Sequence, residues 1–433
     1  MNDLNPITLI CLLLVILLIA IAVSNTLKRH LKLSLAASFI LVGFVMINGI
    51  VLFKPIATLQ DGQLQQLTTY FLLPILLADG AYRFPIHDLR YQRLKPMLLL
   101  PFIFLTSLLL AFLFFLWAFN EQAGGSLLII LAASFLIFMT DILPPHNTLS
   151  VLNTLDKSNP SKTRFTSLVQ VQSLLMSVIA LMFFLGVAQL TGLDPDPSTD
   201  NAGATWYWLY WLWELFGGLV FGFIWGVVGG LIATNIQNYR INLLLLCVII
   251  WLSYLSSIHF FGVSGIMALL TTTLIMSKVH TQFLTPREIS YMRALSRNLR
   301  FMVGMIIFGL IVYKLRVDIL LENWFAMLMV LLVFILSRAI SIYGFLALIL
   351  QLSHRQINMI RQHVLFISTS HSSLILLAVW LLPADTPSKD TYEAMAFALV
   401  LLSLFAQRPR LPQLIQNLMP KKAVRGINLI KNR

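Results

Sequence analysis

The chain has 433 residues, of which 58% are hydrophobic and 11% are charged, and its mean hydropathy is +0.86. Polar surface this sparse could not cover a soluble domain, so the composition indicates a polytopic membrane protein. The formal net charge of +13 would favour nucleic acid as the partner of a soluble protein. In a membrane protein the position of the charges matters more than their sum, and we expect no nucleic-acid partner.

Sequence motifs for catalysis and cofactor binding are missing from the chain. It contains no phosphate-binding glycine loop, no nucleophile triad with usable spacing and no group of residues with metal-ligand spacing. The two cysteines, Cys11 and Cys247, both fall in apolar runs and suggest neither a disulfide nor a metal site. We therefore expect a protein that is not an enzyme and that binds no cofactor and no metal.

Hydropathy predicts about 13 transmembrane helices. The first segment follows Asp3 rather than basic residues, so we interpret it as a retained helix and not as a signal peptide. Near Gly262 two segments follow each other with almost no loop. The predicted segments are 7–25, 33–53, 66–82, 96–119, 125–155, 163–191, 205–234, 241–259, 262–277, 299–315, 319–350, 359–382 and 391–407.

The loops between these segments alternate in charge. Lys and Arg dominate the loops after odd-numbered segments, whereas the loop after the sixth segment is acidic, with Asp194, Asp196 and Asp200. By the positive-inside rule, we expect an integral protein of a bacterial inner (plasma) membrane with its N-terminus outside and its C-terminus in the cytoplasm. We interpret the short basic tail, 408–433, as part of the positive charge that marks the cytoplasmic side. Binding of anionic lipid headgroups is the alternative.

The fifth segment is interrupted by polar and helix-breaking residues. Thr140-Asp141 stand in an apolar run, and Pro144-Pro145 follow. A carboxylate in lipid is costly and marks a functional site, and the two prolines break the helix. Broken helices at this depth are tolerated where they are buried in protein or line a cavity, as in ion-binding transporters. The pattern predicts an ion or proton site at Asp141. A purely structural role, in which the carboxylate balances the partial positive charge of half-helix N-termini, is the open alternative.

A second interruption lies in the twelfth segment, where the run from Ser368 to Ser373 includes Ser370 and His371. It comes seven segments after the first, so the two segments cross the membrane in opposite directions. Inverted repeats with two discontinuous helices produce this pattern. We interpret His371 as a hydrogen-bonded polar residue, while its ordinary pKa would also suit a pH switch.

Two further charged residues stand in apolar segments. Asp79 is either a second acidic ligand or the partner of Arg83 four residues later, and we favour the ion pair. Arg338 needs a polar partner or backbone carbonyls, because an unpaired guanidinium is costly in a membrane.

Four stretches, in chain order, match motifs of one transporter family. FLLPILLADGAY, with Asp79, resembles F-L-P-P-L-L-F-E-A-A-L, and FLIFMTDIL resembles the stretch around Thr-Asp-Pro at Thr140-Asp141. FFGVSGIMALLTTTLIMSK is similar to L-G-V-S-G-V-L-A-V-V-V-A-G-L-V-L-G, and ILSRAISIYG resembles A-R-A-L-S-V-Y at Arg338. From about the second segment to the last, the chain thus resembles the monovalent cation:proton antiporter superfamily, in particular its sodium/proton exchanger branch.

The chain departs from this family at the diagnostic run G-E-S-L-L-N-D. The aligned residues are Val171 to Ser177, so the Asn-Asp pair becomes Met176-Ser177 and the glutamate becomes Gln172. The carboxylate that carries the exchanged ion or proton in the family is therefore absent. Because the glutamate is also missing, we predict that Arg338 is held by Gln172 and by backbone carbonyls.

The resemblance implies an all-α polytopic membrane protein with inverted repeats and two broken helices that cross. It implies core helices at about 96–191 and 319–407, scaffold helices at about 7–82 and 241–315, and a homodimer. The leading function is exchange of a monovalent cation, sodium or potassium, for protons by alternating access in the lipid bilayer. The alternative is a divergent member that transports another solute or acts as a non-transporting sensor or subunit.

The candidate site residues form three sets. Asp141 is the principal carboxylate, because one group that binds the cation and the proton in turn would couple the two fluxes. The ion- or proton-binding set is Asp141, Thr140, Ser173, Ser177 and Asp79; the polar pair is Arg338 and Gln172; and the second helix break contributes His371 and Ser370.

Overall fold

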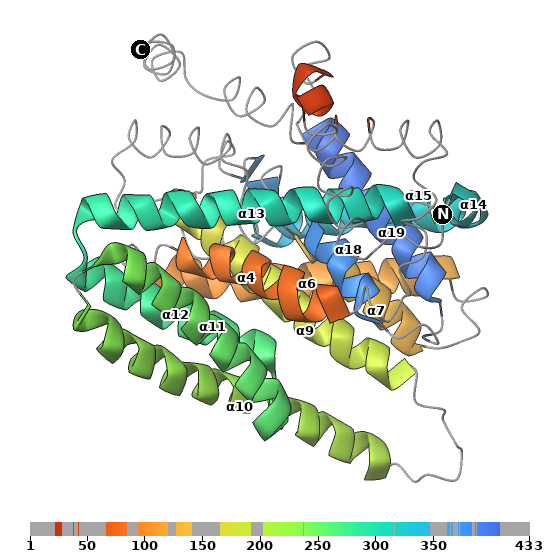
Figure 1. Cartoon of the computed structure of the whole chain (residues 1–433). Coiled ribbons are helices and arrows are strands. Elements are labelled where there is room, and N and C mark those ends of the chain that lie inside the picture. Colours follow the sequence, from red (N-terminus) through yellow and green to blue (C-terminus); the bar gives the residue numbers. More distant parts are fainter. Residues whose placement is uncertain are drawn as a thin grey trace, which may run out of the picture.

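The structure is a computed structural model in which all regular secondary structure of the described residues is helical (Figure 1). The prediction of an all-α polytopic membrane fold is confirmed. The described residues are 22–27, 38, 42, 66–84, 94–119, 127–140, 165–191, 202–236, 238–314, 317–346, 362–363, 365–366, 371, 373–382, 386 and 388–407.

Five described helices are long and apolar enough to cross a membrane. They coincide with predicted segments 4, 6, 7, 8 and 11. These helices are α6 (Leu94–Phe119), α9 (Phe165–Thr191), α10 (Ala202–Thr234), α11 (Tyr239–Phe261) and α15 (Trp324–Ala339), whose apolar span continues to Gly344.

The other described elements are shorter helices, three π-helical turns and one long helix, α13, which runs across the molecule in Figure 1. They are η2 (Thr68–Leu72), α4 (Leu73–Tyr82), α7 (Leu127–Ile137), α12 (Gly265–Phe283), α13 (Pro286–Lys314), α14 (Val317–Glu322), η3 (Ile340–Leu346), α18 (Ser373–Trp380), α19 (Lys389–Leu401) and η4 (Leu402–Gln407).

One group of helices is built on α12, which packs against α10, α11 and α4. Glycines of α10 permit this approach. A Cβ at Gly222 would collide with the backbone of Ala268, and one at Gly218 would collide with the carbonyl of Ser264. Small residues at a helix interface let two backbones come close, so the glycines of α10 fix its position against α12.

A second group joins α6, α7, α9, α15, α18 and α19. Hydrogen bonds to backbone carbonyls connect its members. The Tyr392 hydroxyl of α19 donates to the Ile129 carbonyl of α7 at 3.1 Å, and the Ser341 hydroxyl of η3 donates to the Ile103 carbonyl of α6 at 3.0 Å. These bonds satisfy polar groups that lipid could not, and they hold the second group together.

The close connection predicted around Gly262 is present between α11 and α12. Gly262 adopts a left-handed conformation with φ of 57° and ends α11, which is the usual role of glycine at a helix C-terminus. Ser264 then begins α12 by accepting a hydrogen bond from the Met267 amide at 3.4 Å. The sequence Gly-Val-Ser thus reverses the chain without a longer loop.

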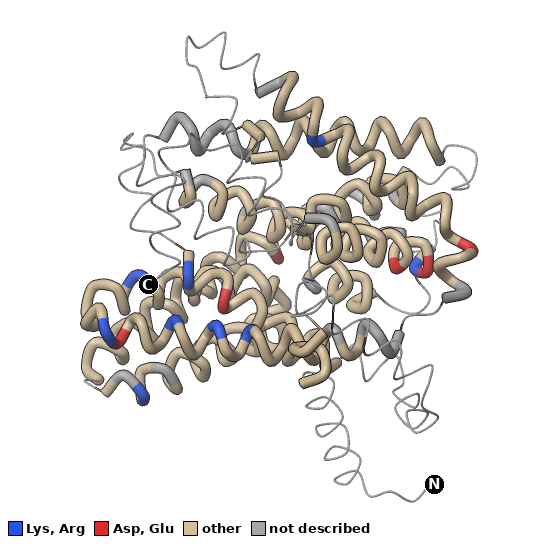
Figure 2. Tube along the Cα trace, turned by 90° about the horizontal axis from the view of Figure 1, so that it is seen from above, with Lys and Arg blue, Asp and Glu red and all other residues tan. Residues whose placement is uncertain are grey.

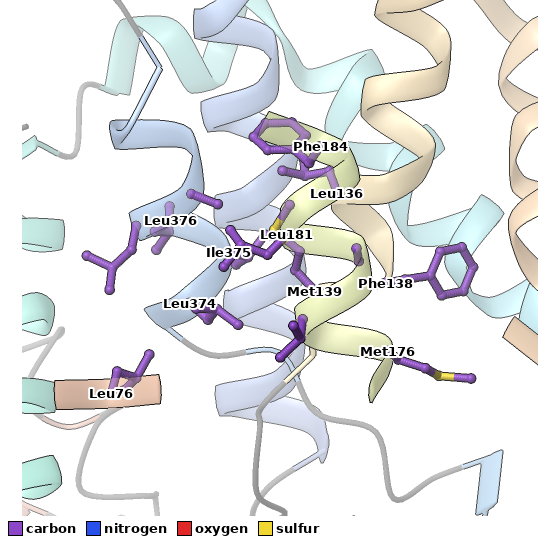
Figure 3. Packing of buried hydrophobic residues seen from close by; sticks show 14 of the residues in the cluster. Leu76, Leu136, Phe138, Met139, Met176, Leu181, Phe184, Leu374, Ile375 and Leu376 are labelled. Atoms are coloured by element: carbon purple, nitrogen blue, oxygen red, sulfur yellow. The ribbon is translucent and has the colours of Figure 1, made fainter. Parts of the chain in front are cut away.

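The short helix α18 is apolar on all sides and lies in the interior. Every residue from Leu374 to Val379 is fully buried. In Figure 3 the side chain of Ile375 lies beside that of Leu181 on α9. An apolar helix in a membrane protein can face either lipid or protein, and α18 is enclosed by protein and packs against α9 and α19.

Candidate ion-binding site at the two helix breaks

The α7 helix ends abruptly inside the protein. The amides of Phe138 and Met139 donate to the carbonyls of Phe135 and Leu136, three residues earlier, and the Thr140 amide donates to the Phe138 carbonyl at 2.9 Å. The helical pattern of hydrogen bonds is thereby lost. Since the last carbonyls of a helix need other donors, this end requires partners from elsewhere in the fold. The predicted interruption of segment 5 is therefore present after Ile137.

Ser177 of α9 supplies the first of these partners. Its hydroxyl is fully buried, 2.7 Å from the Thr140 carbonyl, 2.6 Å from the Ser173 carbonyl and 3.0 Å from the Thr140 hydroxyl. A serine hydroxyl has one proton, so it donates to one carbonyl at a time and can accept from Thr140. Ser177 thus ties the end of α7 to α9, and it brings three of the predicted site residues together.

His371, in the second break, supplies the other partner. Its Nε2 lies 2.7 Å from the Ile137 carbonyl, which can only accept, so Nε2 carries the proton. The His371 amide donates to the Ser403 hydroxyl at 2.8 Å, and the imidazole packs edge-on against Phe334. The two breaks are therefore joined directly, as the prediction of two crossing broken helices requires.

The half-helices meet with opposite polarity. The C-terminus of α7 carries a partial negative charge, and α18 begins with its partly positive N-terminus two residues after His371. Side-chain hydroxyls and an imidazole line this junction, and the residues Thr140, Ser177 and His371 are all 1% exposed or less. Such a buried polar junction can hold a small cation or a proton next to a carboxylate. Asp141 and Ser370, also predicted for the site, lie outside the described residues.

Arg338 is buried at 1% exposure and is held by backbone carbonyls. Its guanidinium donates to the carbonyls of Leu365 at 2.9 Å and Phe366 at 3.3 Å. The predicted bond to Gln172 is not found among the described residues, where the Gln172 amide instead contacts the Met176 sulfur at 3.5 Å. The carbonyl part of the prediction agrees with the structure and the Gln172 part does not. Gln172 is on α9, and its side chain is directed along its own helix.

Asp79 belongs to a different cluster. It is 3% exposed and forms ion pairs with Arg83, four residues on, and with Arg300 of α13 at 3.4 Å. The Ser296 hydroxyl also donates to it. The favoured interpretation of Asp79 as the partner of Arg83 agrees with the structure. Its carboxylate is occupied by these donors, and its hydrogen bonds connect it to α13 rather than to the helix breaks.

Sequence reasoning missed Ser403. It lies in η4 at the end of the last predicted segment, is fully buried and accepts the hydrogen bond from the His371 amide. The available signal was a single hydroxyl in the apolar run LVLLSLF. A lone serine in such a run usually bonds to its own helix, so it did not stand out.

The fold and the joined helix breaks define an integral membrane protein built like a secondary transporter. A sequence model of the transmembrane part of sodium/hydrogen exchangers matches residues 13–412. The chain therefore belongs to the sodium/hydrogen exchanger family, whose members are transporters and exchange cations for protons.

Similar proteins agree with this assignment. The Na(+)/H(+) antiporter NhaG of Bacillus atrophaeus is 23% identical over 407 residues, which cover 92% of this chain and 72% of that protein. The structure of the sodium proton antiporter MjNhaP1 from Methanocaldococcus jannaschii at pH 8 superposes with a TM-score of 0.69 at 15% identity, covering 94% of this chain and 99% of that one. An electron-microscopy structure of MjNhaP1 superposes with a TM-score of 0.67 at 14% identity, covering 96% of this chain and 99% of that one. At 14–15% identity, these superpositions show that the fold is shared and nothing further.

Proposed function

We propose that this protein exchanges a monovalent cation, sodium or potassium, for protons by alternating access. The observation that carries the proposal is the junction of the two helix breaks, where Ser177, Thr140 and His371 form a buried polar centre. Asp141 follows Thr140 in the chain and supplies the carboxylate. The cation and the proton compete for this carboxylate, so that each excludes the other and the two fluxes are coupled.

The roles of the neighbouring oxygens follow from their bonds. The hydroxyl and carbonyl of Thr140 and the carbonyl of Ser173 are hard oxygen donors of the kind that alkali cations accept. Ser177, which stands where the family's G-E-S-L-L-N-D run has its aspartate, holds these groups in place. In this proposal the helices of the second group (α6, α7, α9, α15, α18 and α19) form the moving core, and the group around α12 forms the scaffold and the dimer contact.

The test of the proposed function is proton flux in proteoliposomes that contain the purified full-length chain and a pH-sensitive dye. With a proton gradient imposed, addition of sodium or potassium is expected to dissipate the gradient, and empty vesicles are expected not to respond. Lithium is included as a third cation. No response to any of the three cations at any pH would favour the alternative of a divergent member that moves another solute or does not transport.

We also propose that the N-terminus lies outside a bacterial inner membrane and that the basic tail is cytoplasmic. Single cysteines at Asn201, in the acidic loop, and Asn428, in the tail, test this in a chain whose two native cysteines are replaced. A membrane-impermeant maleimide is expected to label position 201 in intact cells and position 428 only after permeabilisation. Equal labelling of both positions from outside would contradict the orientation.

A further inference from the structure

Arginines gather where the end of α4 meets α13. Arg83, Arg297 and Arg300 lie close enough for their charges to interact. Arg293 lies close enough to Tyr82 for its charge to act on the hydroxyl. Asp79 is the carboxylate at the centre of this cluster, and it is buried. In Figure 2 the blue Lys and Arg segments concentrate at one side of the molecule. The cluster holds four positive charges and one negative charge, so it attracts a further anion.

Part of this arginine cluster is open to a ligand. The side chains of Arg83 and Arg300 are 23% and 22% exposed, and residues Arg293 and Arg297 are exposed. The Nε atom of Arg83 is buried and has no hydrogen-bond partner in the described part of the chain. Arginine presents a planar fork of donors that matches phosphate oxygens, so these side chains suit a phosphate group.

An apolar groove begins at the same place. Asp79 and Tyr82, which belong to the surroundings of the arginine cluster, line it, as does Trp251 of α11. The groove lies between α4, α11 and α13 and has a volume of about 80 Å³. Its lining is almost entirely apolar, and the residues are Pro74, Ile75, Ala78, Asp79, Tyr82, Leu246, Cys247, Ile250, Trp251, Met292, Ser296 and Leu299.

The helical repeat of α13 places the two features side by side. Met292, Ser296 and Leu299 face the groove, and Arg293, Arg297 and Arg300, one residue further on in each case, form the adjacent stripe. Tyr291, Leu295 and Met302 are exposed on the other side of the helix. An amphipathic helix with arginines beside an apolar surface is typical of the boundary between lipid headgroups and acyl chains.

We propose that this arginine cluster and the adjoining groove form a binding site for an anionic phospholipid, with the phosphate on Arg293, Arg297 and Arg300 and part of one acyl chain in the groove. A soluble anion would use only the arginines, whereas a phospholipid matches both the charge and the apolar surface that continues from it. The site is separate from the helix breaks, so the proposal does not depend on the transport function.

The experiment uses the full-length chain in phosphatidylcholine vesicles that contain increasing fractions of phosphatidylglycerol, with one of the two lipids brominated. Bromine quenches tryptophan fluorescence at short range, and Trp251 lines the groove. The chain has nine tryptophans, so a Trp251→Phe variant measures the contribution of the others. Each arginine near an anionic headgroup contributes roughly fivefold in affinity. We expect Trp251 to report at least about a fivefold preference for phosphatidylglycerol.

The double variant Arg293→Gln/Arg297→Gln tests the cluster and leaves the two ion-pair partners of Asp79, Arg83 and Arg300, in place. We expect it to lower the preference by about fivefold or more. The matched control Lys278→Gln/Arg287→Gln removes the same charge from two exposed positions that do not line the groove, and we expect it to keep the preference. In the wild type, raising the salt concentration should weaken the preference, which tests the proposal even if the double variant does not fold.

Three results would overturn the proposal. One is equal quenching of Trp251 by brominated phosphatidylcholine and phosphatidylglycerol. Another is an equal loss of preference in the double variant and its control, which would indicate a general effect of net charge. The third is complete displacement of the lipid by glycerol 3-phosphate, because this headgroup without acyl chains would then be sufficient and the groove would have no role.

Discussion

Asp141→Asn is expected to abolish cation-coupled proton flux in proteoliposomes. Exchange requires one group that releases a proton and then binds a cation, and a neutral amide has no titratable proton to release. Asp141 is the acid at the first helix break, and it follows Thr140, whose hydroxyl and carbonyl both bond to Ser177. The initial rate of the pH change after addition of sodium, lithium or potassium measures the effect, at equal amounts of reconstituted protein.

Ser177→Ala is the matched control for this variant, because it changes the same site and keeps the carboxylate. It removes the hydroxyl donor of a buried carbonyl, which costs about 1–3 kcal/mol, so we expect the flux to be weakened but not abolished. Asp79→Asn distinguishes the two acids. If Asp141→Asn left coupled flux unchanged while Asp79→Asn removed it, the carrier would be Asp79 on α4, and our assignment would be wrong.

His371→Leu is expected to destabilise the protein and to reduce transport strongly. The Nε2–H of His371 is the donor to the Ile137 carbonyl at the buried end of α7. A buried carbonyl that loses its partner costs about 1–3 kcal/mol, and here the loss also separates the two helix breaks. Thermal unfolding of the purified protein and the initial rate of flux are the two measurements.

His371→Gln separates the hydrogen bond from the shape of the side chain. The amide nitrogen of glutamine can donate to the Ile137 carbonyl, so this variant should recover part of both stability and flux. A histidine outside the junction provides the control: His280, which contacts Tyr82 near Asp79, should tolerate replacement by glutamine without loss of coupling. If His371→Leu matched the wild type in both measurements, the junction would not support transport.

The sequence alone determined the class of this protein and the positions of its two interruptions. Long apolar runs with few charges must form membrane helices, because lipid leaves backbone polar groups no other partners. Pro144 and Pro145 marked the first interruption, and the serines around His371 marked the second. Arg83, four residues after Asp79, predicted an ion pair, since both residues lie on one face of one helix. These features depend on neighbours in sequence, which hydropathy and helical spacing describe.

The partners across the fold were decided by the tertiary structure. His371 reaches a carbonyl 234 residues away, Ser177 reaches Thr140 across 37 residues, and Asp79 accepts from Ser296 across 217 residues. The predicted pair of Gln172 and Arg338 shows the limit of sequence reasoning, because the direction of the Gln172 side chain depends on how α9 is rotated in the bundle. A hydrogen bond has a range of about 3 Å, so its partner is set by the packing and rotation of whole helices, which no local pattern in the sequence specifies.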